Sequence, residues 1–185
     1  YLADHVVLAT GNKPRPLTFD GSEHLLSSDE FLDLNHLPDE ITFVGGGYIS
    51  FEFAHVAARA GADVTILQRD DRPLPMFEES IVDELLDLSE ANDIDVQLDV
   101  AAGRIEQDDG SYEIYGKDGD HVVSADMVVH GAGRVPQIDD LDLENAGVDY
   151  ERRGVTVDDC LQTSQDHIYA AGDCAEATHA VTGEP

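Results

Sequence analysis

The hydrophobic residues change their spacing several times along this chain, and each change marks an expected element. Apolar runs at residues 40–44 and 63–67 are typical of buried strands. Between them, residues 48–60 predict a helix that Gly61 ends. A strand, helix, strand unit of this length is typical of parallel strands with a right-handed crossover.

The segment before this unit is less regular. Residues 1–10 form a strand-like run, and the Pro-rich stretch through Pro16 cannot be helical. Residues 28–30, Ser-Asp-Glu, predict the N-cap and acidic first turn of a short helix through residue 34. Because the chain starts on an apolar strand, we expect it to be part of a longer polypeptide.

After this unit, the apolar residues first recur at helical spacing and then at every second position. Residues 78–92 predict an amphipathic helix with Ile81, Leu85 and Leu88 on its apolar face. An apolar strand is expected at residues 126–130. Between helix and strand, turn signals such as Asp-Gly predict an antiparallel meander of four strands, at 95–98, 103–107, 112–115 and 121–124.

Together these elements predict an α/β fold, a Rossmann-like three-layer domain with a parallel sheet plus an antiparallel meander. The domain is expected to span residues 25–132, flanked by segments 1–24 and 133–185 that belong to a second domain. The last segment is expected to be rich in loops, with one strand at 167–171.

Acidic residues dominate the composition. Asp and Glu number 40 against 10 Lys and Arg, which gives a formal net charge of -30. The acids are spread along the whole chain, so their mutual repulsion indicates adaptation to a salt-rich interior where counterions screen it. Nucleic acid is excluded as a partner, because binding a polyanion requires clustered Lys and Arg.

The sequence gives no sign of a membrane or metal protein. No apolar run approaches the roughly 20 residues that cross a bilayer, and no cationic signal segment starts the chain, so a cytoplasmic location is expected. Cys160 and Cys174 are too few and too far apart for a disulfide framework or a metal knuckle. We predict that both cysteines are structural and that no metal is bound, and His179 matches no catalytic position.

The strongest chemical signal is the turn Gly45-Gly46-Gly47, which follows a strand and opens a helix. Gly45 permits a sharp turn, and Gly47 lets a diphosphate approach the amides at the helix start, where the helix dipole favours anions. The third glycine of the usual fingerprint is replaced by Ser50, which is small enough for close packing. The alternative is a glycine-rich turn without a ligand.

The residues at the end of the second strand are expected to determine whether NADH or NADPH is bound. An acid there would bind the ribose diol of NAD, but this chain has Gln68. Arg69 and Arg72 follow and are suited to a 2'-phosphate, so NADPH is favoured over NADH. Asp70 and Asp71 lie between them and could instead serve the diol.

Four segments, in this order, carry a family resemblance: Ala9-Thr10-Gly11; Gly45-Gly46-Gly47-Tyr48-Ile49 with Glu52; Gly131-Ala132-Gly133-Arg134-Val135-Pro136; and Ile168-Tyr169-Ala170-Ala171-Gly172-Asp173. Over essentially its whole length the chain resembles the pyridine nucleotide-disulfide oxidoreductases. It is most similar to their glutathione reductase and mercuric reductase branch.

The resemblance implies roles around the nicotinamide. Tyr48 is similar to the tyrosine that covers the flavin ring and swings aside for nicotinamide, and Glu52 resembles the acid that faces the nicotinamide amide. These two are the candidate catalytic residues. Without the resemblance, Tyr48 would be taken as a packed aromatic side chain and Glu52 as a solvated helix acid.

The resemblance also implies contacts with FAD. Asp173 resembles the aspartate that binds the ribityl chain, Thr163 the threonine ahead of its strand, and Gly11 a flavin-side turn glycine. Arg134 matches the arginine of the returning connection, which could equally be a cross-link between domains. The remaining positions implied to contact a cofactor are Ile49, Gly131, Ala132, Gly133 and Gly172.

The implied function is an FAD-dependent oxidoreductase that passes hydride from NADPH to FAD and on to a small disulfide, as glutathione reductase does. Mercuric reductase and dihydrolipoamide dehydrogenase are close alternatives. A flavin NADH oxidase or ferredoxin reductase is a second class, and a non-catalytic nucleotide-sensing module a third. The resemblance makes residues 25–132 the NAD(P)-binding domain and the flanking segments parts of an FAD domain.

The redox cysteine pair that this chemistry needs, held in a CxxxxC motif, is absent from the sequence. We therefore expect the fragment alone to be unable to turn over a disulfide. A homodimer is implied for the whole protein and a monomer for the fragment, with no membrane partner.

Overall fold

The computed structural model describes residues 2–177. Residue 1 and residues 178–185, among them His179, lie outside the described part. The chain divides into two compact units, one formed by residues 16–133 and the other by the chain up to residue 15 together with the chain from residue 134 onward. Each unit is described by itself.

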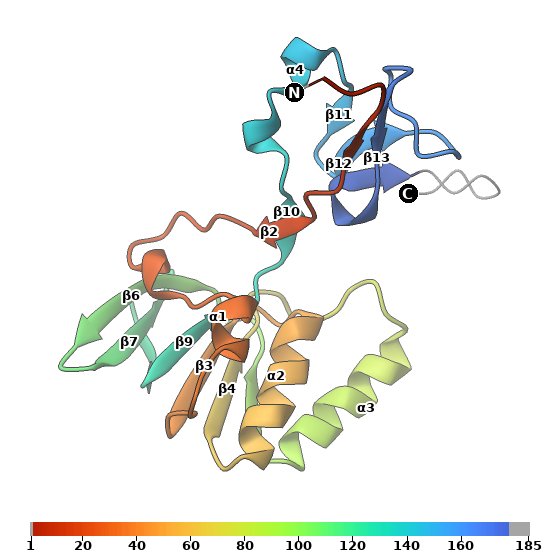
Figure 1. The fold of residues 1–185 in the computed structure, drawn as a ribbon. Helices are drawn as coiled ribbons and strands as arrows, with labels where there is room; N and C mark the ends of the chain where they lie inside the picture. Colours follow the sequence, from red (N-terminus) through yellow and green to blue (C-terminus); the bar gives the residue numbers. More distant parts are fainter. Residues whose placement is uncertain (1, 178–185) are drawn as a thin grey trace. The chain divides into compact units, whose positions relative to one another are not determined.

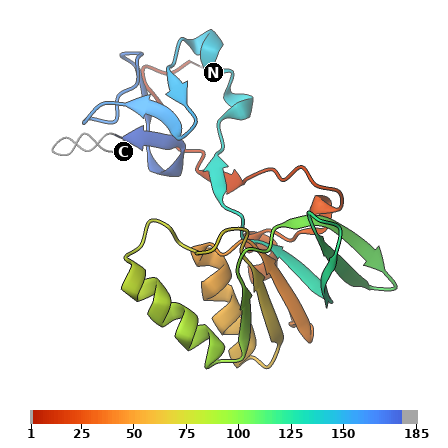
Figure 2. The same ribbon diagram turned by 180° about the vertical axis from the view of Figure 1, so that it is seen from behind.

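The unit 16–133 is built on a four-stranded parallel sheet in the order β5-β4-β3-β9. Three helices and a three-stranded antiparallel meander, β6-β7-β8, complete this unit (Figures 1 and 2). The sheet strands are β3 (Glu40–Val44), β4 (Asp63–Leu67), β5 (Ile94–Gln97) and β9 (Met127–His130). The other elements are α1 (Ser28–Leu32), α2 (Tyr48–Arg59), α3 (Glu79–Glu90), β6 (Ala102–Asp108), β7 (Ser111–Gly116), β8 (His121–Ala125) and a short 3-10 helix at Ser22–His24.

Both faces of the parallel sheet are buried, which makes the unit three layers thick. In β3, Ile41 and Phe43 pack with the helices, whereas Val44 packs with the meander. Successive strand residues point to opposite faces, so one apolar run supplies both cores. The predicted α/β three-layer fold class is confirmed, and β3 and β4 have the predicted bounds.

Three details differ from the sequence-based expectation in this unit. The strand expected to open the meander is β5, which instead pairs parallel with β4. The N-cap of α1 is Ser27 rather than Ser28, and it forms a reciprocal capping box with Glu30. The buried face of α3 centres on Val82 and Ser89, whereas two residues of the predicted face are more than half exposed: Ile81 (59%) and Leu88 (51%).

The unit boundary falls before Pro16, ahead of the predicted domain start at residue 25. Backbone pairing explains the difference. The amide of Leu26 donates to Val128 (2.9 Å), and the amide of Ile105 donates to Asp20 (2.9 Å). Because these bonds tie residues 20–26 to the sheet and the meander, the chain joins this unit earlier than its apolar pattern indicates.

The second unit contains short strands around one small core. β1 and β13 pair parallel, β2 and β10 pair antiparallel, and β12 lies between β11 and β14. After residue 133, only β13 was predicted, from the longer apolar run at 167–171. The other strands there have two to four residues and carry too little pattern to be recognised. The elements are β1 (Val6–Leu8), β2 (Asn12–Pro14), β10 (Arg134–Pro136), α4 (Leu143–Ala146), β11 (Tyr150–Glu151), β12 (Gly154–Val157), β13 (Ile168–Ala170), β14 (Ala175–Ala177) and 3-10 helices at Asp139–Leu141 and Gly172–Cys174.

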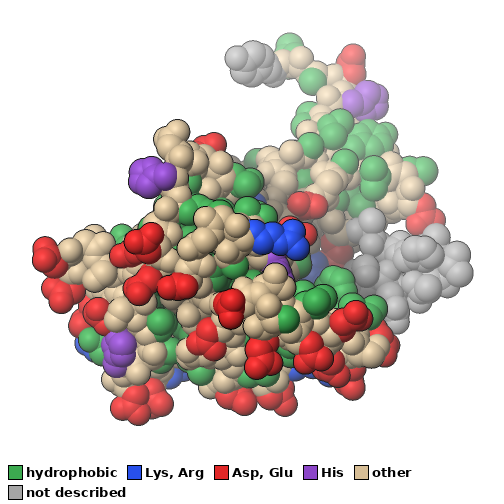
Figure 3. Space-filling model, turned by 90° about the horizontal axis from the view of Figure 1, so that it is seen from below, with side chains coloured by type: hydrophobic (Ala, Val, Ile, Leu, Met, Phe, Trp, Pro, Cys, Tyr) green, Lys and Arg blue, Asp and Glu red, His purple; other side chains and the backbone are tan. Residues whose placement is uncertain are grey.

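Carboxylates are scattered across the molecular surface. Figure 3 shows Asp and Glu side chains distributed over the visible face, with few Lys and Arg among them. Cys174 is buried and Cys160 is exposed, and both are free thiols. No group of three or more potential metal ligands was found within the described residues.

Candidate nucleotide and flavin sites

The glycine turn joins the carboxyl end of β3 to the start of α2. Gly45 adopts a φ of 106°, a conformation that other L-residues rarely accept. Gly47 is the N-cap of α2 with extended backbone, and Gly46 between them is buried. The chain therefore reverses within three residues and presents the first turn of the helix at the edge of the sheet.

A second loop, Gly131-Ala132, lies against this turn because β9 pairs directly with β3. A Cβ atom on Gly45 would lie 2.6 Å from the Cα of Ala132, and one on Gly47 would lie 2.8 Å from the carbonyl oxygen of Gly131. These distances are shorter than real Cβ contacts allow. The two loops can approach this closely only because three of the four facing positions are glycine.

Ser50, which replaces the third glycine of the fingerprint, has a role of its own. Its hydroxyl donates a hydrogen bond to the carbonyl oxygen of Gly45 (2.5 Å), and its side chain is fully buried. A Cβ on Gly131 would lie 1.7 Å from this hydroxyl. Ser50 thus ties the helix to the turn, a bond that glycine could not make.

The start of α2 is open to an anion. Its N-cap provides no side-chain hydrogen bond, and no acid occupies the first turn. The first amides of an α-helix have no partner within the helix, and the dipole adds partial positive charge there. In a chain of net charge -30, a helix start without acids favours a bound phosphate.

Gln68 directly follows β4 beside the turn and is buried, with 7% of its surface exposed. Its Oε1 accepts a hydrogen bond from the amide of Gly46 (3.0 Å), and its Nε2 donates to the carbonyl oxygen of Arg72 (3.0 Å) and to Asp70 Oδ2 (3.3 Å). The side chain therefore points into the protein and holds the turn, rather than projecting toward a ribose.

The two arginines after β4 are paired with acids. Arg69 Nε lies 3.0 Å from Asp70 Oδ2. Arg72 extends toward α3, with its Nη1 3.2 Å from Glu79 Oε1 and its Nη2 3.6 Å from Asp83 Oδ1. Neither guanidinium is held ready for a phosphate by the protein alone.

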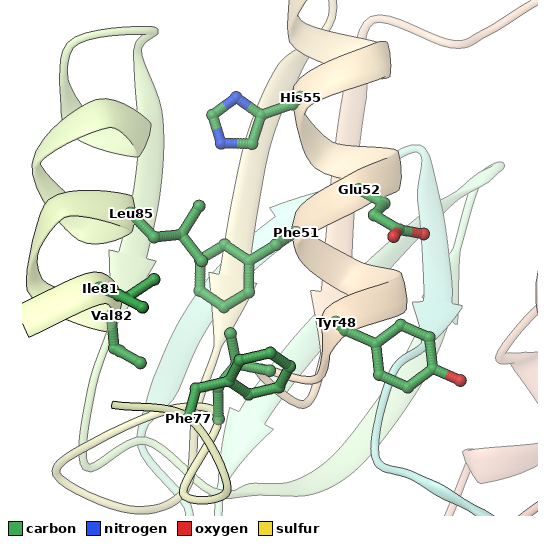
Figure 4. Close-up of a pocket in the computed structure, with 9 residues that line it drawn as sticks. Tyr48, Phe51, Glu52, His55, Phe77, Ile81, Val82 and Leu85 are labelled. Carbon is green, nitrogen blue, oxygen red and sulfur yellow. The ribbon is translucent and has the colours of Figure 1, made fainter. Parts of the chain in front are cut away.

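Tyr48 and Glu52 are exposed, one turn apart on α2. Both line a mainly apolar pocket of about 350 Å³ between α2 and α3. In Figure 4 they project from the side of α2 away from α3, while His55 points toward α3. The apolar part of the pocket is formed by Phe51, Leu74, Phe77, Ile81, Val82 and Leu85. Tyr48 is 55% exposed.

In the second unit, a polar cluster surrounds Asp173, which belongs to the 3-10 helix after β13. Asn12 Nδ2 donates to Asp173 Oδ2 (2.9 Å). Arg134 Nε donates to Asn12 Oδ1, and its Nη2 donates to the carbonyl oxygen of Asn12 (2.9 Å). Sequence reasoning did not single out Asn12, although it directly follows the predicted turn residue Gly11.

This cluster opens into a polar hollow of about 570 Å³ within the second unit. Arg15, Arg134, Arg152 and Arg153 line it together with Asp173. Such a concentration of arginine in a strongly acidic chain favours an anionic ligand with polar groups.

Three other predicted flavin-side residues shape the backbone of this unit. Gly11 and Gly172 have left-handed φ values of 69° and 74°. Thr163 is buried and donates through Oγ1 to the carbonyl oxygen of Ile168 (2.9 Å), which anchors the start of β13. Thr163 therefore acts on the strand that positions Asp173.

Comparison with known proteins gives the family. The model for pyridine nucleotide-disulphide oxidoreductases matches residues 1–184. The chain belongs to this family. It is 36% identical over 174 residues to a dihydrolipoyl dehydrogenase of Bacillus subtilis, covering 92% of this chain and 38% of the relative. A dihydrolipoyl dehydrogenase of Haloferax volcanii is 37% identical over 181 residues, covering 95% and 38%.

Solved structures of flavoproteins share the fold. The HOCl-induced flavoprotein disulfide reductase of Escherichia coli, in a Cu(II) complex, superimposes with a TM-score of 0.85 at 28% identity, covering 92% of this chain and 40% of that one. A ferredoxin reductase of Rhodopseudomonas palustris gives 0.86 at 29% identity, covering 98% and 46%. The chain thus spans about two fifths of these relatives, and the resemblance read from its four motifs is confirmed.

Within this family member, the structure brings the predicted nucleotide-site residues together in one unit. These are Gly45, Gly46, Gly47, Tyr48, Ile49, Glu52, Gln68, Arg69, Arg72, Gly131, Ala132 and Gly133. The predicted flavin-side residues Gly11, Arg134, Thr163, Gly172 and Asp173 lie in the other unit. None of the described helices is both long enough and apolar enough to cross a membrane.

Proposed function

We propose that this chain binds a nicotinamide dinucleotide in the unit 16–133 and presents it to FAD in a larger oxidoreductase that reduces a small disulfide. The observation that carries the proposal is the pair of loops at the open start of α2. A larger residue could not replace Gly45, Gly47 or Gly131, because the backbones of the two loops lie too close together for a Cβ atom.

The chain's own groups fit a dinucleotide. The first amides of α2 would donate to the diphosphate, with the helix dipole contributing further attraction. Ser50 holds the carbonyl of Gly45 away from that anion through its hydrogen bond. Gln68 fixes the amide of Gly46, so the turn keeps its shape without a ligand.

Tyr48 and Glu52 follow the glycine turn on α2, where the nicotinamide end of the nucleotide would extend. We infer that the Tyr48 ring shields this place and moves when the ring of the nucleotide arrives. The carboxylate of Glu52, which is exposed, would accept a hydrogen bond from the carboxamide and orient the ring. These roles remain predictions of the family resemblance.

The second unit fits FAD. Bound FAD would supply hydride acceptance and electron transfer to a disulfide. Asp173 would accept from the ribityl hydroxyls, and Asn12 and Arg134 hold its neighbourhood through their mutual hydrogen bonds. Since a protein that only senses nucleotide has no use for such contacts, this cluster argues against the sensing module.

The substrate is proposed at two levels. A small disulfide, as for glutathione reductase, follows from the resemblance to that branch. Dihydrolipoamide is the second candidate, because relatives at 36% and 37% identity are named dihydrolipoyl dehydrogenase. A ferredoxin reductase is among the structural neighbours. It supports the alternative proposal, in which the whole protein is a flavin NADH oxidase or ferredoxin reductase and does not reduce a disulfide.

The cellular setting and the assembly are part of the proposal. The net charge of -30 supports a salt-rich location and argues against a nucleic-acid partner. A cytoplasmic homodimer without a membrane partner is proposed for the whole protein from the family resemblance. The relative from Haloferax volcanii also supports a salt-rich setting.

The test is an anaerobic titration of the full-length flavoprotein with NADH or NADPH in molar KCl. We expect flavin reduction with a long-wavelength band from a thiolate beside the flavin. Flavin reduction without this band would replace the disulfide reductase by the oxidase or ferredoxin reductase class. No reduction by either nucleotide, while dithionite still reduces the flavin, would overturn the proposal.

A matched pair of variants localises the effect. Gly47→Ala places a methyl group 2.8 Å from the carbonyl oxygen of Gly131 without backbone strain, so reduction by nucleotide should fall while reduction by dithionite persists. Gly110→Ala strains an exposed hairpin turn (φ 100°) where no atom lies within 4 Å. This control should lose stability but keep its response to nucleotide.

A further inference from the structure

We propose that the preferred nucleotide is NADH, with Asp70 rather than Gln68 taking the adenine-side ribose diol. The inference rests on the proposed function and decides a question that it leaves open. The prediction of NADPH assumed that Arg69 and Arg72 are available for a 2'-phosphate. The structure engages both guanidinium groups with carboxylates.

Gln68 is removed from the ribose by its own hydrogen bonds. Both ends of its amide are used inside the protein, by Gly46 on one side and by Arg72 and Asp70 on the other. Turning the side chain outward would break three hydrogen bonds and leave a buried backbone amide without an acceptor. Gln68 supports the turn and does not read the nucleotide.

Asp70, three residues beyond the end of β4, has the available acceptor instead. Its side chain accepts hydrogen bonds from Arg69 Nε (3.0 Å) and Gln68 Nε2 (3.3 Å), and both bonds end on Oδ2. The other carboxylate oxygen, Oδ1, is left to accept from a ribose hydroxyl. The backbone of Asp70 is held by the amide of Asp99 (3.2 Å), so its side chain starts from a fixed position.

Arg72 is directed away from this place. Its side chain is 28% exposed, and both terminal nitrogens face the carboxylates of Glu79 and Asp83 on the first turns of α3. To bind a 2'-phosphate, Arg72 would have to leave both partners. Arg69 is more available, because an exposed ion pair such as Arg69–Asp70 is weak.

Charge decides between the two nucleotides. Asp70 pairs with Arg69, and Glu79 and Asp83 pair with Arg72, so three carboxylates accompany the two cations, and Asp71 lies between the arginines in sequence. A phosphate monoester carries nearly two negative charges near neutral pH. The carboxylates at this site would repel the 2'-phosphate of NADPH, whereas the ribose diol of NADH would donate hydrogen bonds to them.

Calorimetric titration of the full-length protein with NAD+ and NADP+ tests the inference without requiring turnover. Circular dichroism defines the range of KCl over which the protein stays folded. At the low end of that KCl range, we expect NAD+ to bind about tenfold more tightly than NADP+. NAD+ lacks the 2'-phosphate, and removing one repulsion between like charges changes an affinity by about this factor. The difference should narrow in molar KCl, because salt screens the repulsion of the 2'-phosphate.

The opposite pattern would overturn the inference. If arginines bound the 2'-phosphate, NADP+ would bind more tightly, and its advantage would decrease with salt. Equal affinities at all salt concentrations would also overturn it. If neither nucleotide bound, the proposed function would fail as well, so the two failures are distinguishable.

Variants identify the groups. The pair Glu79→Gln and Asp83→Asn releases Arg72, so the affinity for NADP+ should rise about tenfold while that for NAD+ stays the same. The pair Glu84→Gln and Asp87→Asn is the control, which removes two acids from the same helix without releasing an arginine. An equal rise in both pairs would mean that only net charge matters and that Arg72 has no part.

Asp70→Asn tests the diol contact directly. An amide is a weaker acceptor than a carboxylate, so the affinity for NAD+ should fall several-fold, to a free energy loss of about 1 kcal/mol. Asp71→Asn, the neighbouring exposed acid, should leave it unchanged. Unchanged NAD+ binding by Asp70→Asn would contradict the assignment of the diol to this residue.

Discussion

Gln68 shows how a single amide can do what a carboxylate cannot. At one end it accepts from the Gly46 amide, and at the other it donates to the carbonyl oxygen of Arg72. A carboxylate has no proton to donate at neutral pH. Glutamine at this position therefore connects the glycine turn to the loop after β4.

Replacing Gln68 by Leu should destabilise the protein by about 1–3 kcal/mol, because the buried amide of Gly46 would be left without an acceptor. Urea unfolding at constant KCl measures this loss. Gln107→Leu, an exposed change on β6, is the matched control and should have little effect. Equal losses in the two variants would show that the hydrogen bonds of Gln68 contribute nothing.

The residues that form the glycine turn could be predicted from the sequence, but the directions of the side chains around it could not. The sequence placed Gly45, Gly47 and Ser50 at the turn, because a glycine-rich strand-to-helix turn is a local pattern. It could not show that Gln68 points inward or that Arg72 turns to α3. Those directions depend on partners 22 residues away, at Gly46, and on α3.

Helices α2 and α3 are joined by one polar contact in an otherwise apolar interface. His55 Nε2 lies 3.2 Å from Ser89 Oγ, and Ser89 is fully buried. The hydroxyl of Ser89 donates its only proton to the carbonyl oxygen of Leu85 (2.8 Å). It can then only accept from His55, so the neutral imidazole carries its proton on Nε2.

Burial lowers the pKa of His55 below its ordinary value of 6.5, with a further contribution from the nearby positive charge of Arg59. A lowered pKa in the folded state means that stability is fully present above pH 6.5 and is lost as pH falls through the folded pKa. Urea unfolding from about pH 7.5 down to about pH 5 should show this loss. His55→Gln should lose part of that slope, and an unchanged slope would exclude His55 as its source.

Element types followed from the sequence more reliably than pairing. β3, β4 and α2 were predicted within a residue or so, because each has a clear apolar pattern, and a glycine follows β3 and α2. β5 was assigned to the wrong sheet, since a strand of four residues carries no information on whether its neighbour is parallel. The buried face of α3 was misplaced by one position, because Ile81 and Val82 are both apolar and only packing distinguishes them.

At the scale of the whole molecule, charge is the dominant feature. A net charge of -30 on 185 residues opposes folding in dilute buffer, because carboxylates such as those on the face in Figure 3 repel one another. The few ion pairs among the described residues involve exposed carboxylates and contribute little against this. Counterions must therefore provide part of the stability.

The protein should unfold more easily as KCl is lowered from molar to millimolar concentration, since the Debye length grows and repulsion reaches further. Circular dichroism and the urea midpoint at each concentration measure the effect. Identical midpoints at both extremes would show that the acidic surface is not an adaptation to salt.

The two glycine loops that contact each other follow β3 and β9, which are separated along the sequence by α2, α3 and the meander. Gly45 follows β3, whereas Gly131 follows β9, whose neighbour Asp126 bonds to Glu40 across 86 positions of sequence. A contact between such distant positions forms only after the intervening chain has collapsed. The proposed nucleotide pocket therefore cannot form in an isolated strand, helix, strand fragment, and nucleotide binding would report that the last strand of the sheet has been inserted.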